Sequence, residues 1–293
     1  MCHVPQEGSL IPTRTVAGQL SFPLELRDLP RGEIAKRIRA EGNVLGILGL
    51  FHRRPHELSA GEAQKVAVGR ARTRVPDALL LDEPLALVDA HQRQRLRREL
   101  RTYQQAGALT VVLATNDHDE ALAIADRVAV LHEGRVQQVG TPEAVLTRPV
   151  SAWVAAFVGE QPMALADGHV EDDGGVGHVV VAGQRLRMPG GLPGPLRDRV
   201  GVRLRFGARP HQVRAVEPGD PADARLVATV RRTVLLPHVQ LVHLDTEGGE
   251  WVARFPTDVR RRPGERVEVT VDVRGLTAFD AGSGSVVWHG GAV

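Results

Sequence analysis

Residues 58–89 read LSAGEAQKVAVGRARTRVPDALLLDEPLALVD and combine a helix start with a strand end. Ser59 is placed as an N-cap, and Glu62 follows three residues later, which is the spacing of a capping box. Ala60 and Gly61 open the helix between them. Such a start can be a plain well-capped helix, which the residues alone favour. It can also bind an anion, because its free N–H groups and positive dipole end point outward.

Four apolar residues, Ala78 to Leu81, precede the acidic pair Asp82 and Glu83. A short run of this kind is typical of a strand buried on both faces of a parallel sheet, where ligands bind beyond the carboxyl ends of strands. Two adjacent carboxylates there are costly unless their charge is compensated. Mg²⁺ with a nucleotide phosphate would compensate it, with Asp82 serving the metal and Glu83 a water. An ordinary strand end that carries acidic residues is the alternative.

Together these segments resemble the signature and Walker B motifs of the ATPase subunits of ABC transporters. LSAGEAQKVAVGRA is similar to the family's LSGGQxQRVAxxRA, LLLDEP follows it, and Asp89 stands at the D-loop position. Ala60 departs from a signature glycine, and Glu62 is a common variant of its glutamine. The resemblance implies ATP and Mg²⁺ as cofactors. It also implies that Ser59 and Gly61 contact the γ-phosphate across a dimer, with Glu83 as the catalytic base.

Two further segments resemble the family. Gln6 opens QEGSLIPTRTV, which resembles the Q-loop of sugar-importer ATPases. Thr110 to Ala114 predicts another buried strand, and TNDHDEA follows where the family reads T-H-D-x-x-E-A. Asn116 therefore occupies the position of the switch histidine, and Asp117 with Glu120 has the spacing of a second capping box.

The resemblance thus assigns the candidate site in three groups. Catalytic positions are Glu83 and Asn116, and the metal is reached by Gln6 and Asp82. The implied nucleotide contacts are Gln6, Ser59, Ala60, Gly61, Glu62, Asp82 and Asp89.

A phosphate-binding loop of the form G-x-x-x-x-G-K-[ST] does not occur in the sequence. The two lysines, Lys36 and Lys65, follow alanine and glutamine, so neither fits that loop. The resemblance therefore starts at the Q-loop and lacks the Walker A portion, and we expect the chain alone to bind ATP weakly. By family the function is ATP hydrolysis that energises a permease. The alternative is a degenerate, non-catalytic subunit or gene remnant that acts as a binding module.

Helical and hairpin patterns surround these motifs. Residues 17–51 have helix-compatible apolar spacing, and residues 91–105 predict a helix whose charged side is most simply a solvated face. Residues 127–131 and 135–139 flank His-Glu-Gly, which predicts a hairpin with Gly134 in a positive-φ conformation.

The sequence pattern changes from Asp167 onward to short alternating strands with turn signals about every ten residues, which predicts a barrel or sandwich. Residues 207–210 resemble the G-x-R-P motif of the OB-like domain of importer ATPases. The predicted fold class is α/β. Residues 1–160 form a partial P-loop NTPase parallel sheet with a helical subdomain, and residues 165–293 form an all-β OB-like regulatory domain.

Composition limits the partners. The net charge of +2 with dispersed arginines favours a solvated surface, so no nucleic-acid partner is expected. The single Cys2 excludes an internal disulfide framework and fits a reducing compartment. No secretory signal and no run of about 18 apolar residues occurs. We therefore expect a peripheral protein at the cytoplasmic face of the membrane. Transmembrane permease subunits and a second ATPase subunit, identical or paired, would be its partners in the maltose and glycerol-phosphate branch of sugar importers.

Overall fold

The computed structural model describes residues 1–6, 9–107, 109–159 and 161–291. Two compact units make up the chain, Met1–Asp126 and Arg127–Val293.

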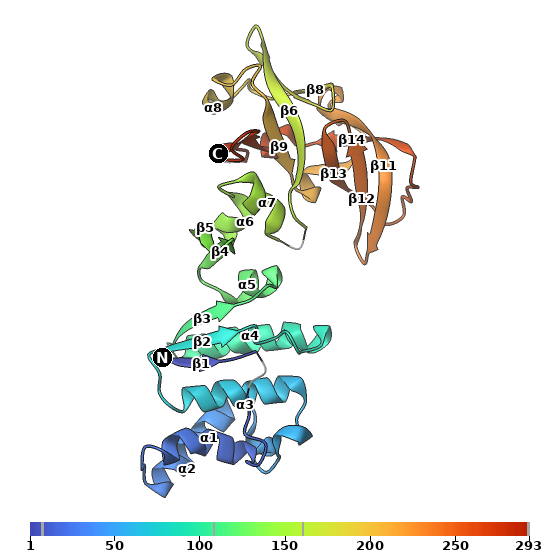
Figure 1. The fold of residues 1–293 in the computed structure, drawn as a ribbon. Coiled ribbons are helices and arrows are strands. Elements are labelled where there is room, and N and C mark those ends of the chain that lie inside the picture. The colour runs from blue at the N-terminus through green and yellow to red at the C-terminus, as the bar shows by residue number, and fades with distance from the viewer. Residues whose placement is uncertain (7–8, 108, 160, 292–293) are drawn as a thin grey trace. The chain divides into compact units, whose positions relative to one another are not determined.

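A parallel three-stranded sheet lies at the centre of the first unit (Figure 1). It consists of β1 (Cys2–Val4), β2 (Ala78–Asp82) and β3 (Thr110–Ala114), and β2 pairs with both neighbours. Strand β3 pairs with β2 alone among the residues described.

Side chains of β2 alternate in burial. Leu79 and Leu81 are 1% and 5% exposed and pack with apolar residues of the neighbouring helices. Leu80 points to the other face, where it is only half-buried, and its register partner Val112 is 55% exposed. The expectation that this strand is buried on both faces is therefore wrong, because the helices of this unit cover one face of the sheet.

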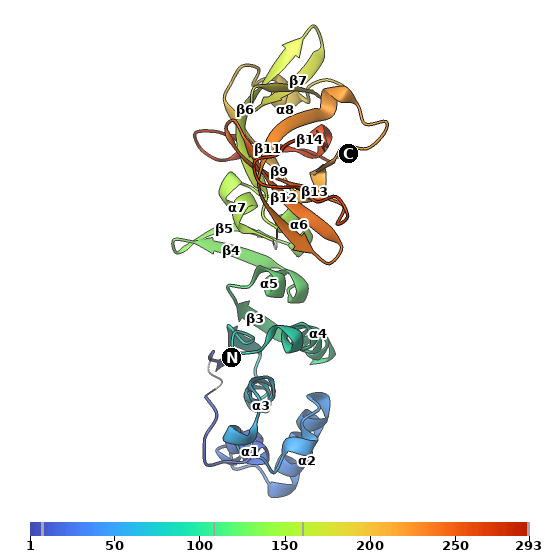
Figure 2. The same cartoon turned by 90° about the vertical axis from the view of Figure 1, so that its right-hand side faces the viewer.

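The helices of the first unit are α1 (Val16–Glu25), α2 (Arg31–Val44), α3 (Ala60–Arg72), α4 (Ala90–Gly107) and α5 (His118–Ile124). Helix α3 lies between the sheet and the pair α1 and α2 (Figures 1 and 2). Its Ala67 and Ala71 pack on the sheet, whereas Val66 packs against Leu20 of α1. The helical segment predicted over residues 17–51 is confirmed.

The second unit begins with the predicted hairpin, β4 (Val128–His132) and β5 (Arg135–Gly140). Glu133 and Gly134 have φ angles of 47° and 73°. Positive φ at both central residues is the backbone twist that a two-residue hairpin turn requires, so this prediction is confirmed.

A β-rich region follows. Its elements are α6 (Pro142–Thr147), α7 (Ala152–Phe157), β6 (Ala164–Asp173), β7 (Val176–Val181), β8 (Gln184–Arg187), α8 (Gly194–Arg197), β9 (Leu204–Ala208), β10 (Val213–Ala215), β11 (Arg225–Leu236), β12 (Val239–Thr246), β13 (Gly249–Phe255), β14 (Arg266–Val271), β15 (Thr277–Asp280) and β16 (Val286–His289). Five strands close into a ring in the order β10, β14, β11, β12, β13, because β13 also pairs with β10. A five-stranded ring agrees with the predicted barrel. The core of the β-rich region contains Trp251, Phe255 and Phe206, each at most 1% exposed, so these aromatic residues serve packing.

Arg209 connects α6 and α7 to the β-rich region. Its side chain is 8% exposed and donates to the carbonyl oxygens of Leu146, Gln161 and Val158 at 2.6, 3.2 and 3.4 Å. Burial lowers the pKa of this guanidinium. Residues 127–159 therefore belong to the same compact unit as the β-rich region, whereas the boundary at 160–165 follows the family resemblance and stays a prediction.

Candidate functional site

Three parallel strands end at one edge of the sheet in the first unit. Asp82 is the last residue of β2, Gln6 follows β1, and Asn116 follows β3. The backbone N–H of Glu83 donates to the carbonyl oxygen of Ala114 at 2.8 Å, which ties the ends of β2 and β3 together. Glu83 has φ = 40°, a conformation that residues other than glycine rarely adopt. Backbone conformations of this kind concentrate at functional sites, so this strand end is a candidate site.

Gln6 and Glu83 are joined directly. The amide Nε2 of Gln6 donates to Oε2 of Glu83 at 3.1 Å. The amide oxygen of Gln6 and the carboxylate of Asp82 make no hydrogen bond or ion pair with the residues described, and Asp82 is exposed. Amide and carboxylate oxygens are the ligands that Mg²⁺ prefers, so the residues at this edge fit that ion.

Asn116 lies in a segment that is anchored on both sides. Thr115 Oγ1 accepts from the backbone N–H of Asp117 at 3.0 Å and donates to Oε2 of Glu120 at 2.8 Å. Asp117 Oδ1 accepts from the N–H of Glu120 at 3.0 Å and caps α5. The Asn116 side chain is exposed to solvent. The predicted capping box of Asp117 and Glu120 is half formed, because the Glu120 carboxylate bonds Thr115 instead of the backbone of Asp117.

Asp117 and Glu120 differ in their electrostatics. Glu120 is 2% exposed, and burial raises the pKa of its carboxyl despite the hydrogen bond from Thr115. At Asp117 burial acts in the same direction. The N–H of Glu120 and the charges of Arg97 and Arg93 outweigh it, so the pKa of Asp117 is lowered. Asp117 is therefore the charged partner of two arginines.

The helix start at Ser59 is formed as the sequence predicts. Ser59 Oγ accepts from the N–H of Glu62 at 3.3 Å, and Glu62 Oε2 accepts from the N–H of Ser59 at 2.8 Å. Ser59 and Ala60 are exposed, whereas Gly61 is buried. Among the described residues no hydrogen bond or ion pair joins this helix start to Gln6, Asp82 or Glu83.

The predicted site residues thus fall into separate places. The structure brings together the side chains of Gln6 and Glu83, with Asp82 adjacent in the chain, and it places Asn116 after the neighbouring strand. Asp89 is exposed just before α4.

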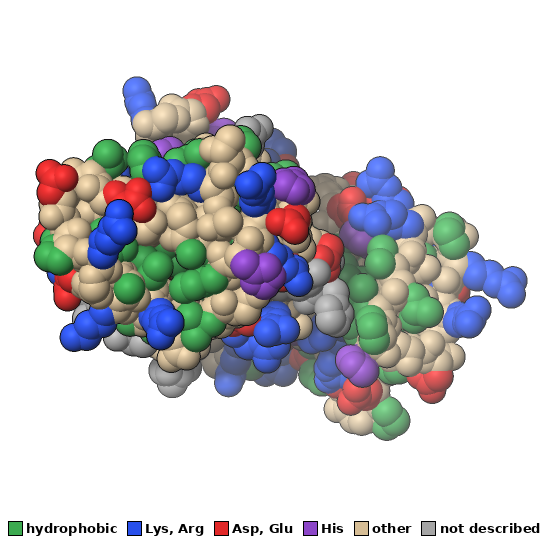
Figure 3. Space-filling model, turned by 90° about the horizontal axis from the view of Figure 1, so that it is seen from below, with side chains coloured by type: hydrophobic (Ala, Val, Ile, Leu, Met, Phe, Trp, Pro, Cys, Tyr) green, Lys and Arg blue, Asp and Glu red, His purple; other side chains and the backbone are tan. Residues whose placement is uncertain are grey.

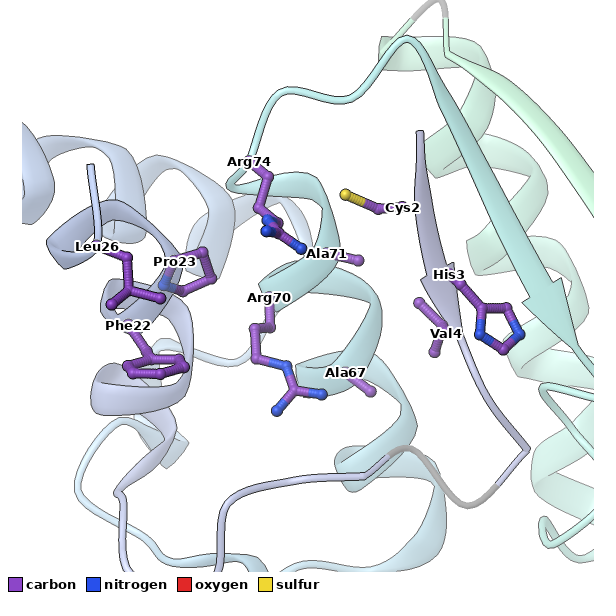
Figure 4. A pocket seen from close by; sticks show the side chains of 10 residues that line it. All are labelled: Cys2, His3, Val4, Phe22, Pro23, Leu26, Ala67, Arg70, Ala71 and Arg74. Atoms are coloured by element: carbon purple, nitrogen blue, oxygen red, sulfur yellow. The ribbon is translucent and has the colours of Figure 1, made fainter.

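A cavity of about 210 Å³ lies elsewhere, between α1, α3 and β1 (Figure 4). Phe22 of α1, Arg70 of α3, Arg74 just after α3, and Cys2 of β1 contribute to its lining. His3 points to the side of β1 away from α3 in the same view. None of the predicted site residues lines this cavity.

Three arginines of α4 make contacts that the sequence did not predict. The charged side of the helix predicted over residues 91–105 was expected to be solvated. The side chain of Arg95 is 75% exposed and agrees with this expectation, whereas those of Arg93 and Arg97 are only 31% and 17% exposed and do not. Arg93 and Arg97 contact the carboxylate of Asp117, and Arg101 donates to the carbonyl oxygen of Ile124. Their spacing of four residues, which puts them on one helix face, is the signal that could have identified them. On the face shown in Figure 3, Lys and Arg side chains lie among acidic and apolar ones.

Comparison with known proteins gives one consistent family. The family described as ABC transporter matches residues 1–86. The trehalose/maltose import ATP-binding protein MalK of Thermococcus litoralis is 36% identical over 291 residues, covering 97% of the chain and 77% of that protein. The sn-glycerol-3-phosphate import ATP-binding protein UgpC of Chromobacterium violaceum is 36% identical, covering 98% of the chain and 75% of that protein. The spermidine/putrescine import ATP-binding protein PotA of Rubrobacter xylanophilus is 35% identical, covering 92% and 71%.

Among the residues described, no helix has both the length and the apolar character needed to cross a membrane.

Proposed function

The chain belongs to the family of ATP-binding proteins of ABC transporters, and we propose that it is the ATP-binding subunit of an importer for sugars or related small solutes. The hydrogen bond between Gln6 and Glu83 is the observation that carries this proposal. It unites the ends of two parallel strands beside the exposed carboxylate of Asp82. Ligands bind at such carboxyl ends of parallel strands, so this edge suits a nucleotide with its metal.

Each residue at the edge has a chemical role in this proposal. Asp82 and the amide oxygen of Gln6 would hold Mg²⁺, which when bound neutralises phosphate charge. Glu83 would accept the proton of the attacking water, and its position is fixed by the bond from Gln6. Asn116 would donate one hydrogen bond toward the terminal phosphate but carries no positive charge. We therefore expect the nucleotide to be held better than it is turned over.

The exposed helix start at Ser59 would act on a second nucleotide. Its outward N–H groups and the Ser59 hydroxyl can bind a phosphate of a nucleotide held mainly by another ATP-binding subunit. That arrangement accounts for the separation of Ser59 from Gln6 and Asp82 within one chain. Under this proposal the chain works as a dimer, or paired with a related subunit. It would lie at the cytoplasmic face of the membrane through contact with permease subunits.

A non-catalytic binding subunit is the alternative function. The relatives reported above give it no specific support. Asn116 at the switch position is compatible with both functions, since asparagine can bind phosphate without supporting fast hydrolysis. The two functions differ in ATP turnover by the assembled transporter, not in nucleotide contact.

Titration of the isotope-labelled full chain with Mg-ATP tests nucleotide contact even at low affinity. Amide shifts should change at Gln6, Asp82, Glu83 and Asn116, and Asp82→Asn should remove most of the response. Glu83→Gln is the matched control, because Glu83 is assigned to the water and its replacement keeps the shape of the side chain. Equal responses of Asp82→Asn and the unaltered chain, or shifts confined to other regions, would contradict the proposal.

A further inference from the structure

Helix α4 carries a row of arginines that faces the segment around Asn116. Arg97 Nη2 lies 2.7 Å from Oδ2 of Asp117, and Arg93 Nη1 lies 3.4 Å from the same oxygen. One turn further along, Arg101 Nη1 donates to the carbonyl oxygen of Ile124 at 2.7 Å. The side chains of Arg93 and Arg97 are only 31% and 17% exposed, so solvent screens these contacts less than at an open surface. The row therefore holds both ends of α5 against α4.

Arg93 also binds a second segment. Its Nη2 donates to the carbonyl oxygen of Val88 at 3.0 Å. Val88 ends a short turn that starts at Glu83, because the N–H of Ala86 bonds the carbonyl of Glu83 and the N–H of Val88 bonds that of Leu85, each at 3.1 Å. One guanidinium thus connects the turn that carries Glu83 with the N-cap that follows Asn116.

The geometry around these two contacts links the positions of the two segments. Val88 and Leu85 are 4% and 1% exposed and pack on Leu96 of α4, so the turn has a fixed backbone position. The planar guanidinium presents its N–H groups in a rigid fork, so one displaced partner reorients the bond to the other. Lysine would bind as a single point charge and could not hold both partners in this way.

We propose that Arg93, reinforced by Arg97, is a positioning residue that sets the orientation of Asn116 relative to Glu83. Asp117 transmits its effect to the Asn116 segment, and the carbonyl of Val88 transmits it to the turn of Glu83. The relevance of these two residues to catalysis rests on the proposed function. The coupling itself is a property of the chain without nucleotide.

Amide hydrogen exchange of the full chain without nucleotide tests this coupling. Asp117→Asn keeps the cap oxygen of α5 but removes the charge that holds Arg93 and Arg97. Exchange at Ala86 and Val88, which Asp117 does not contact, should accelerate by at least about tenfold, while the amide of Glu120 stays protected by the retained cap. A merely local role of Asp117 would leave the amides of the distant turn unchanged.

Two arginine variants complete the experiment. Arg93→Lys should accelerate exchange in both segments, and the side-chain amide signals of Asn116 should shift. Arg95→Ala is the matched control, because Arg95 lies on the same helix and loses only its exposed ion pair with Glu99 at 2.8 Å. Unchanged exchange at Ala86 and Val88 in Asp117→Asn, or equal profiles for Arg93→Lys and Arg95→Ala, would overturn the proposal. Absence of any nucleotide response with the coupling intact would instead count against the proposed function alone.

Discussion

The two units bury the apolar side chains of their sheets in different ways. In the second unit five strands close into a ring, and residues such as Trp251 and Phe255 fill its interior. In the first unit the three-stranded sheet is covered by helices on one face, and β3 has one unpaired edge among the residues described. Val112 at that strand is 55% exposed. A closed ring buries its apolar residues within itself, whereas the open sheet leaves apolar surface and, among the residues described, one strand edge exposed.

The largest expected effect is on independent folding. Residues 127–293 alone should unfold in one cooperative transition, because their core lies within the unit. Residues 1–126 alone should associate at micromolar concentration, because the sheet face with exposed Val112 and the edge of β3, unpaired among the residues described, favour strand pairing. Calorimetry and light scattering of the two fragments measure this difference. A monodisperse fragment 1–126 that melts cooperatively would contradict the difference expected between the two units.

Arg209→Ala tests whether α6 and α7 belong to the closed unit. The substitution leaves three carbonyl oxygens without their donor, so the free energy of unfolding of residues 127–293 should fall by about 2–4 kcal/mol. Arg203→Ala is the control, since Arg203 is 76% exposed and its pair with Asp167 should contribute no more than about 1 kcal/mol. Urea unfolding of both variants measures the difference. Equal losses in the free energy of unfolding would show that Arg209 stabilises the unit no more than the exposed Arg203 does.

A smaller effect is expected from Asp220. The hydrogen bonds from Arg214, from the N–H of Glu217 and from the Thr270 hydroxyl hold the pKa of Asp220 well below its usual range. A carboxyl with a lowered pKa in the folded state adds stability above its unfolded pKa and loses it as the pH falls. Asp220→Asn should therefore lower Tm at pH 7 and have progressively less effect below about pH 4. A deficit that is the same at pH 7 and pH 3 would exclude this ionic origin.

Local rules explain what the sequence predicted well. The capping box of Ser59 and the hairpin turn at Gly134 depend on neighbouring residues, and both are confirmed. The short strands of the β-rich region follow from repeated alternation and turn signals. These features need no knowledge of which segments meet in space.

Long-range partners explain what could not be predicted. Strand β1 has three residues, too few for any periodicity, and it forms because β2 offers a parallel edge. Glu120 accepts a hydrogen bond from the Thr115 hydroxyl instead of from the backbone N–H of Asp117, because a buried carboxylate needs a nearby donor. The contacts of the arginine row of α4 could not be predicted, because they form only where α5 packs beside α4. The meeting of Gln6 and Glu83 at the sheet edge was implied by family resemblance, not by spacing.

The central claim is that the ends of β1 and β2 form one metal and nucleotide edge, and paramagnetic relaxation by Mn²⁺ tests it most directly. Mn²⁺ replaces Mg²⁺ at oxygen ligands and broadens the signals of nearby nuclei. In the full chain with ATP, the amides of Gln6, Asp82 and Glu83 should broaden first, and Asp82→Asn should abolish the effect while Glu83→Gln retains it. Broadening that spares these three residues, or that persists unchanged in Asp82→Asn, would contradict the account.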